Sequence, residues 1–280
     1  FDHPCYFGAM SSRYLDTGLD ILSDAIQHSS FDADELSNEL EVIREEIKRT
    51  KDNPGKMAAL KLFETGYQQH PYRLPVIGTE ESVSSFDRED VVGFFEKHYV
   101  PDNMALVLAG DFEVDEAREK VEEYFGDMTR EVDYDPKERA TEPTQESFRG
   151  FTEARDLQQT QLRMGFHIPD AMDEDIPALD LLSAILGKGD ASHLQQTIKR
   201  RRQWVNSISA SAYTPEDAGM LIVSGNYQLD EDEKRTHADT VRGILEEIFR
   251  FREMNVSEQD LERARTMIES REIYGKETVQ

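Results

Sequence analysis

The chain has 280 residues and a formal net charge of −26, with 58 acidic side chains against 32 lysines and arginines. So large an excess of negative charge argues against nucleic acid or an anionic membrane as a partner, because both would repel it. The sequence contains no apolar run of about eighteen residues, which excludes a membrane-spanning helix within it. Its length is sufficient for two domains with separate cores.

Two features of the composition, the acidic surface and the single cysteine, support further predictions. Arginine outnumbers lysine, and acids occupy the predicted helix surfaces, a pattern typical of proteins adapted to high salt. The alternative is an acidic surface that only keeps the chain soluble by self-repulsion.

Cys5, the only cysteine, excludes an intrachain disulfide and is predicted to be a small buried residue of a strand.

The first long helix is predicted between residues 31 and 54. Asp32 is a suitable N-cap, with Glu35 three residues later to complete a capping box. Pro54, preceded by Asp52 and Asn53, is expected to close the helix. The apolar stripe consists of Leu36, Leu40, Ile43 and Ile47.

Two acids of this helix, Glu39 and Glu46, lie within the predicted apolar arc. At about 100° per residue their side chains project within roughly 20° of each other, between Val42 and Ile43. A carboxylate on a core-facing surface is costly unless a cation, a metal or several donors receive it. Two hypotheses follow: Glu39 and Glu46 pair with basic residues of a neighbouring element, or they belong to a metal site.

The remainder of the chain alternates predicted strands and helices, which favours an α+β fold with antiparallel sheets. The predicted elements are a buried strand at 103–110, a helix at 114–125, a polar linker at 131–145, a half-buried strand at 161–167, an antiparallel pair at 207–213 and 220–227, and a helix at 230–254.

The sequence also indicates an internal duplication. Residues 18–26 match residues 178–186, and residues 258–261 open a charged helix much as residues 34–36 open the Glu39/Glu46 helix. The position that matches Glu46 in the second copy is Arg271, which cannot bind a metal. We therefore expect two similar α+β domains, only the first of them metal-binding.

Motifs in the first half resemble the M16 (pitrilysin-like, insulinase) zinc peptidases. The run E-x-x-V-I-x-x-E, from Glu39 to Glu46, is followed by I-K-R-T-K-D-N-P as in that family. The similarity continues, in order and spacing, through His70-Pro71-Tyr72, Val76-Ile77-Gly78, Phe94-Phe95, Tyr99, Pro101, Asn103 and Leu108-Ala109-Gly110-Asp111, and it extends over nearly the whole chain.

The resemblance implies a zinc-dependent endopeptidase that hydrolyses peptides. By that resemblance Glu46 is the third zinc ligand, Glu39 is a supporting acid beside it, and the fold is the LuxS/MPP-like metallohydrolase α+β fold. The implied cofactor is Zn²⁺, whose bound water would be activated for hydrolysis. The alternative, from another class, is a non-catalytic M16-like scaffold or partner subunit.

One departure from the family pattern is as informative as the match. The H-x-x-E-H string, which supplies two zinc-binding histidines and the general base, is not in this sequence. The segment from Asp2 to Met10 resembles the family's strand downstream of that string. We therefore expect that the motif precedes Phe1, or else that a paralogue lacks it. In either case this chain alone is expected to bind no zinc and to be inactive.

The expected organisation follows from the resemblance and the linker. Residues 1–135 would form an M16 peptidase domain without its H-x-x-E-H segment, residues 136–147 a linker, and residues 148–280 a second, inactive M16-like domain truncated at its C-terminal end. Family halves work in pairs, and the second half carries an Arg and a Tyr that receive the substrate. The matching positions here are Lys199 and Asn206, so the resemblance implies a partner half or homologous subunit that carries the Arg/Tyr pair.

Four other features are predicted to be structural. They are a turn at Gly187-Lys188-Gly189, intramolecular charge partners at Lys199–Arg202, a structural loop histidine at His70, and a core anchor at Trp204.

Overall fold

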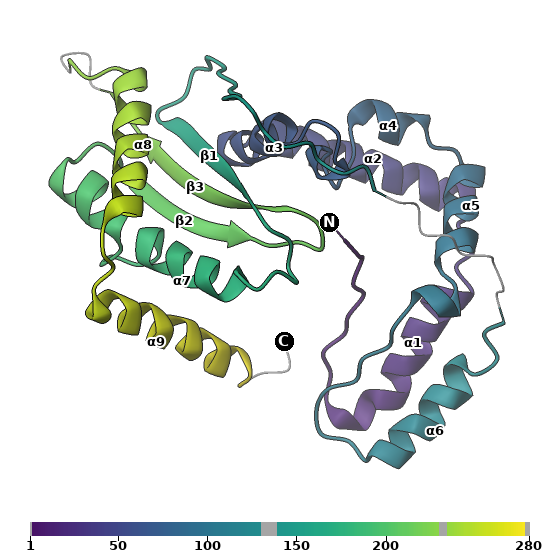
Figure 1. Ribbon diagram of the computed structural model, residues 1–280. Coiled ribbons are helices and arrows are strands. Elements are labelled where there is room, and N and C mark those ends of the chain that lie inside the picture. Colours follow the sequence, from purple (N-terminus) through teal and green to yellow (C-terminus); the bar gives the residue numbers. More distant parts are fainter. Residues whose placement is uncertain (1, 130–138, 230–233, 278–280) are drawn as a thin grey trace. The chain divides into compact units, whose positions relative to one another are not determined.

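The computed structural model describes residues 2–129, 139–229 and 234–277, which divide into two compact units (Figure 1). The sheet unit contains Asp2, Thr50–Pro75 and Ala140–Gly275. The described residues of the helical unit are 3–49, 76–129, 139 and 276–277. No helix among the described residues is long and apolar enough to cross a membrane.

A three-stranded antiparallel sheet with the order β1-β3-β2 forms the centre of the sheet unit. Its strands are β1 (Thr160–Ile168), β2 (Ser207–Tyr213) and β3 (Gly219–Tyr227). In the register, Arg163 lies opposite Ser224, and Ser224 opposite Ser209. The strand predicted at 161–167 and the pair at 207–213 and 220–227 are thus confirmed. The helical elements of this unit are α3 (Pro54–Gly66), η2 (Pro71–Arg73), α7 (Ile176–Gly187), η4 (Gln195–Arg201), α8 (His237–Glu253) and α9 (Glu258–Gly275).

The main core lies on one face of this sheet. Met164 is buried there and Leu162 and Phe166 pack beside it, so the predicted inward alternation of β1 is correct. The same cluster includes buried residues of α7, η4, α8 and α9. Of the helix predicted at 230–254, residues 230–233 lie outside the described residues, and its predicted inner residues Val241, Leu245 and Ile248 do pack against the core.

The opposite face of the sheet carries α3, which lies alongside β1 (Figure 1). A small cluster of Tyr67, Tyr72 and Met220 is buried here, with Leu62 and Phe63 packed against it. Pro54 has a different role from the predicted one. The preceding helix already ends at Lys51, and Pro54 is the first residue of α3, where a missing N–H costs nothing. The Asn53 side chain caps α3 by accepting from Lys56 N at 3.0 Å.

The helical unit has no strand among its described residues. The N-cap predicted for its long helix at 33–51 is correct, since Asp32 Oδ1 accepts from the N–H groups of Asp34 and Glu35 at 2.9 and 3.2 Å. Lys120, in the helix at 114–125, forms an ion pair of 2.6 Å with Asp16, in the helix at 15–27. The elements are η1 (Ser12–Tyr14), α1 (Leu15–Gln27), α2 (Ala33–Lys51), α4 (Glu80–Ser85), α5 (Arg88–His98), η3 (Pro101–Asn103) and α6 (Val114–Phe125), the last as predicted.

Two predicted strands of the helical unit do not form. The segment at 103–110 has no strand, and Leu106 and Val107 are 42% and 80% exposed rather than buried. The segment from Asp2 to Met10 is likewise without strand structure, and Cys5 is exposed. A strand needs a neighbour to receive its N–H and C=O groups, and the described part of this unit offers none to either segment.

The α+β class predicted from the sequence is confirmed. Both segments of each matched pair in the proposed duplication are helical. Residues 18–26 lie in α1 and residues 178–186 in α7; residues 34–36 lie in α2 and residues 258–261 in α9. The predicted linker at 131–145 falls partly outside the described residues, and its part from 140 onward belongs to the sheet unit.

Candidate functional site: the acidic face of α2

The candidate metal ligand lies on an open face of α2. Glu39 and Glu46 are both exposed, and Val42 between them is 58% exposed. The prediction that this arc faces a core is therefore wrong for the described residues, and only Ile47 of the stripe is buried. Because water reaches both carboxylates, no desolvation cost requires a partner for them.

The ion-pair hypothesis also finds no support here. Neither Glu39 nor Glu46 has an ion pair or hydrogen bond among the described residues, whereas their neighbours do. Glu41 lies 3.6 Å from Arg44, and Glu45 accepts from Lys48 at 2.7 Å. Arg44 and Lys48 thus pair with acids on the other faces of α2, and the face of Glu39 and Glu46 carries two free carboxylates beside an exposed valine.

A partly buried cluster of aromatic rings contacts the start of α2. Phe31 lies edge-on to Phe95 of α5 at 5.0 Å, and Phe95 packs against Tyr99 at 4.7 Å. The Arg88 guanidinium donates to Phe31 O at 2.6 Å and to Ser30 O at 2.9 Å. These contacts fix the entry to α2 and, with it, the direction in which Glu39 and Glu46 project.

The described residues do not make a complete zinc site. No group of three or more His, Cys, Asp and Glu side chains among them is arranged to hold a metal ion. A structural or catalytic zinc takes three or four protein ligands in a tetrahedral arrangement. Glu46 can supply one such ligand, and the described chain supplies no histidine beside it.

A second polar cluster surrounds His70 in the sheet unit. The ring is 3% exposed; its Nδ1 accepts from Tyr72 N, and its Nε2 lies 3.2 Å from Asp217 Oδ2. Because Nδ1 accepts, the proton is on Nε2 and is donated to Asp217. The Tyr72 hydroxyl donates to Asp2 and accepts from Asp217 N, and burial raises the pKa of this phenol. These groups are hydrogen-bonded to one another, so His70 has a structural role, as predicted.

Glu142 fastens the segment after residue 139 to the same loop. Its carboxylate, 4% exposed, accepts from the N–H groups of Gln68, Gln69 and His70 at 2.9 to 3.1 Å. Arg149 Nη1 donates to it at 3.2 Å. Burial alone would raise the pKa of Glu142, but these hydrogen bonds together hold that pKa below its usual value. No sequence signal indicates this contact, since Glu142 lies in a polar segment without periodicity.

Glu247 of α8 is a second enclosed carboxylate of the sheet unit. It is 3% exposed and receives His193 Nε2 at 3.0 Å, Arg202 Nη2 at 3.0 Å and Arg250 Nη1 at 3.4 Å. Arg202 also stacks on Trp204, 4.7 Å from the ring centroid. The basic cluster therefore acts within the chain, as predicted: Arg202 pairs with Glu247, and Arg200 pairs with Asp190 at 3.0 Å.

The remaining predicted positions are distributed around the sheet unit. Lys199 is half-buried in η4, and Asn206 is exposed, its N–H donating to Asn226 O at 2.8 Å. Gly187 ends α7, and Gly189 has a φ of +75°, so this segment is a turn as predicted. Trp204 packs against the core.

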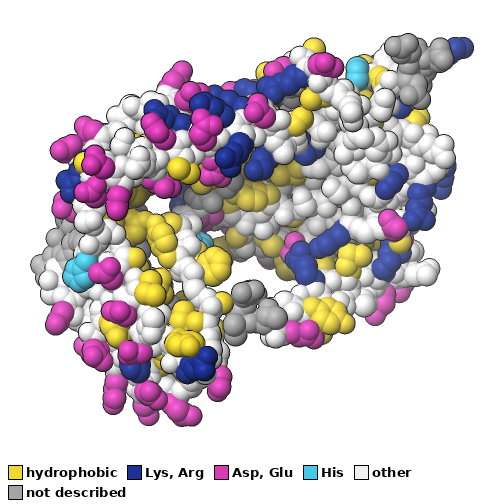
Figure 2. Space-filling model, turned by 180° about the vertical axis from the view of Figure 1, so that it is seen from behind, with side chains coloured by type: hydrophobic (Ala, Val, Ile, Leu, Met, Phe, Trp, Pro, Cys, Tyr) yellow, Lys and Arg dark blue, Asp and Glu magenta, His cyan; other side chains and the backbone are white. Residues whose placement is uncertain are grey.

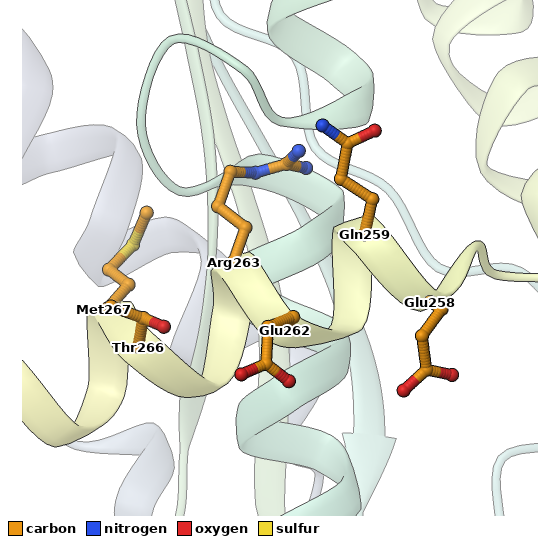
Figure 3. A pocket seen from close by; sticks show the side chains of 6 residues that line it. All are labelled: Glu258, Gln259, Glu262, Arg263, Thr266 and Met267. Atoms are coloured by element: carbon orange, nitrogen blue, oxygen red, sulfur yellow. The ribbon is translucent and has the colours of Figure 1, made fainter.

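An open depression on α9 carries no catalytic arrangement. All six residues that line it come from the same helix, and Figure 3 shows Gln259 and Arg263 extending to one side and Glu258 and Glu262 to the other. Arg263 is already paired with Asp260 at 2.7 Å. No nucleophile, base or metal-binding group converges here.

Comparison with known proteins identifies the family. The family model of the peptidase M16 inactive domain matches residues 85–268, and that of insulinase (peptidase family M16) matches residues 1–80. The chain therefore belongs to the M16 peptidase family, as the motifs around Glu39 and Glu46 predicted.

Relatives and solved structures agree with this assignment. An uncharacterized zinc protease of Bacillus subtilis, YmxG, is 29% identical over 226 residues, which cover 80% of this chain and 54% of that protein. One of Rickettsia felis is 28% identical over 98% of this chain and 64% of its own length. The crystal structure of a protease from Helicobacter pylori has the same fold, with a TM-score of 0.89 at 20% identity, over 96% of this chain and 65% of that one. The chain thus spans between about half and two thirds of these relatives.

Proposed function

We propose that the protein is a zinc-dependent endopeptidase that hydrolyses peptides, with Glu46 as one zinc ligand and Glu39 as the acid that supports it. The observation that carries this proposal is the unpaired state of these two glutamates on one exposed face of α2. Family membership and the zinc-protease names of the relatives support it. In this role Glu46 would bind through a carboxylate oxygen, and Glu39 would accept a hydrogen bond that orients a neighbouring group.

We propose further that the chain does not act alone. The described residues supply one zinc ligand rather than a full set, so the remaining ligands would come from outside them. A domain at 1–135, a linker at 136–147 and an inactive domain at 148–280 remain our proposed division. Lys199 lacks the planar fork of arginine, and Asn206 lacks a phenol that could donate to an oxyanion. The Arg/Tyr pair would therefore come from a second M16 half.

The second candidate function is a non-catalytic M16-like scaffold or partner subunit. The observation that favours it is the match of residues 85–268 to a domain described as inactive. This alternative requires neither a metal at Glu46 nor a role for Glu39.

Metal content of the full-length protein separates the two functions. We expect about one zinc per wild-type molecule and peptide cleavage that chelation abolishes. Glu46→Gln should lose most of the zinc and the cleavage, and Glu39→Gln should weaken zinc binding about 10- to 100-fold. Glu45→Gln is the matched control, because Glu45 is the adjacent exposed acid and pairs with Lys48.

Two outcomes would contradict the peptidase proposal. Wild-type zinc content in Glu46→Gln would remove Glu46 from the ligand set. A full-length protein that binds no zinc and cleaves no peptide would establish the scaffold instead. The 280-residue chain by itself should bind no zinc, and tight binding that Glu46→Gln abolishes would show that the described residues suffice.

A further inference from the structure

A pocket in the sheet unit lies along β2, away from the residues of the proposed peptidase site. Its volume is about 420 Å³, within the range typical of pockets that hold small molecules. The helix α7 packs against β2, and α9 packs against α7 (Figure 1). Residues of these three elements, of η4 and of the turn after α7 form the walls of the pocket.

The turn after α7 places Lys188 in the wall of this pocket. Gly187, at the end of α7, lies so close to β2 that a Cβ atom there would be 2.1 Å from Ala210 N. Gly189 follows with a φ of +75°, a conformation that favours glycine. The two glycines thus allow the turn to lie against the strand, and the side chain between them is that of a half-buried lysine.

Lys188 and Arg271 are two cations in the walls of the same pocket. Among the described residues, neither side chain forms an ion pair or a hydrogen bond, and the Arg271 side chain is exposed on α9. Both charged groups are therefore available to a ligand.

The two cations also affect each other. Burial lowers the pKa of Lys188, and the charge of Arg271 lowers it further. Asp180, in the same wall, opposes that shift only in part and forms no ion pair with either cation among the described residues. Like charges that approach each other in a partly buried pocket are unfavourable until an anion receives them. The pocket thus has the charge arrangement of an anion-binding site.

We propose that this pocket binds a phosphate group, held between the Lys188 ammonium and the Arg271 guanidinium. A phosphate carries up to two negative charges and can neutralise both cations, whereas a carboxylate neutralises only one. The guanidinium fork can hold two phosphate oxygens, and the ammonium can donate to another. Ala212 and Ile268 supply apolar surface to the same pocket, which suits the organic part of a phosphate monoester.

Calorimetry with the 280-residue chain tests the proposal. The measurements are made in EDTA at 0.15 M KCl and pH 7.5, where a phosphate monoester is a dianion. The probes are inorganic phosphate, phenyl phosphate and benzoate. Both phosphate probes should bind, and benzoate should bind about tenfold more weakly than phenyl phosphate because it carries one charge. Benzoate binding as tight as that of phenyl phosphate, or no binding by either phosphate probe, would overturn the proposal.

The two phosphate probes separate the sources of the phosphate group. Tighter binding of phenyl phosphate identifies a phosphate monoester as the ligand, and equal or tighter binding of inorganic phosphate identifies the free ion. Either result supports the proposal only if it depends on Lys188 and Arg271.

Lys188→Gln and Arg271→Gln should each weaken phosphate binding about 10- to 100-fold, because each removes a charge-assisted hydrogen bond. Arg265→Gln is the matched control. It removes the same charge from an exposed arginine of α9 that does not line the pocket, and it should leave the affinity unchanged. An equal loss in all three variants would reduce the effect to net charge and overturn the proposal. Unchanged affinity in Lys188→Gln or in Arg271→Gln would overturn it as well.

A variant that gains affinity keeps the test valid if Lys188→Gln or Arg271→Gln folds poorly. Asp180 lines the same pocket and repels an anion, so Asp180→Asn should tighten phosphate binding several-fold. Glu246→Gln, which removes the same charge from an exposed position of α8, should not. Equal affinities of Asp180→Asn and the wild type would contradict the proposal. The binding needs neither zinc nor Glu46, so Glu46→Gln should leave it unchanged, and the phosphate site and the peptidase proposal fail separately.

Discussion

The sheet unit and the helical unit use the same kinds of residue with different results. In the sheet unit, apolar alternation on β1 meets a paired neighbour, and Met164 and Val223 are buried together in one cluster. In the helical unit, the apolar run at 103–110 has no ladder partner among the described residues, and Val107 is 80% exposed. An apolar pattern therefore specifies a strand only where another strand completes its hydrogen bonds.

Carboxylates show the same contrast. Glu247 and Glu142 of the sheet unit are enclosed, and each is held by several donors. Glu39 and Glu46 of the helical unit are exposed and unpaired in the described structure. Figure 2 shows many acidic side chains spread over the visible face of the molecule. Buried acids here have a structural role, and the free pair on α2 is available for a functional one.

The largest expected effect is the loss of the Glu247 cluster. Glu247→Ala leaves Arg202 without its counterion and His193 without its hydrogen-bond partner, which should lower the free energy of unfolding by about 3–5 kcal/mol. Urea unfolding followed by Trp204 fluorescence measures this, because Arg202 stacks on that ring. Glu246→Ala, an exposed neighbour on the same helix, is the control and should change stability by less than about 0.5 kcal/mol. Equal effects of the two variants would show that the Glu247 cluster contributes nothing to the free energy of unfolding.

Loss of the Glu142 contact should be the next largest effect. Glu142→Gln leaves Arg149 without its charge partner and weakens the bonds to Gln68 and Gln69, at a cost of about 1–3 kcal/mol. Because the pKa of Glu142 is lowered in the folded state, its contribution is present above the ordinary value of 4.5 and is lost as the pH falls through the lowered pKa.

Chemical unfolding of wild type and Glu142→Gln between pH 7 and pH 3 measures this difference. The gap between the two should narrow at the acidic end. Glu146→Gln, an exposed acid in the same segment, should show no such gap. A gap that widens as the pH falls would reverse the assigned direction of the pKa.

The sequence was most predictive where the chain satisfies itself locally. The Asp32 cap, the helix at 114–125 and the alternation of Leu162, Met164 and Phe166 follow from spacing alone, and the structure contains all three. The sequence does not distinguish the two possible roles of Pro54, because a proline that ends one helix and one that begins the next have the same local signal.

The contacts of Glu142 and Arg163 could not be foreseen. Both depend on which distant segments the fold brings together, Glu142 on the loop at His70 and Arg163 on Gly55. The positions of Glu39 and Glu46 on one face of α2 were predicted, but their exposure was not, because helical periodicity shows which side chains share a face and not what covers that face.

Salt should affect the helical unit more than the sheet unit. Repulsion among exposed acids reaches about 30 Å at 0.01 M salt and about 3 Å at 1 M. Raising KCl from 0.01 to 1 M should therefore increase the melting temperature by several degrees. For a chain of this size, that corresponds to about 1–2 kcal/mol in the free energy of unfolding. Hydrogen exchange resolved by segment should show the larger gain in protection on α2 and α6. A melting temperature unchanged over that range would mean that the acidic surface serves solubility alone.

The smallest expected effect concerns the free acids of α2, and it tests the contrast between the units most directly. Glu46→Gln and Glu39→Gln should each change the free energy of unfolding by less than about 0.5 kcal/mol, because neither carboxylate has a partner in the described structure to lose. Ile47→Ala, one residue away but 4% exposed, should cost about 2–5 kcal/mol and serves as the internal reference. Thermal unfolding of the three variants in EDTA provides the comparison. A loss of more than about 1 kcal/mol in Glu46→Gln would mean that this carboxylate supports the fold. Stability unchanged in EDTA, together with zinc content lost in the full-length protein, would assign it to function alone.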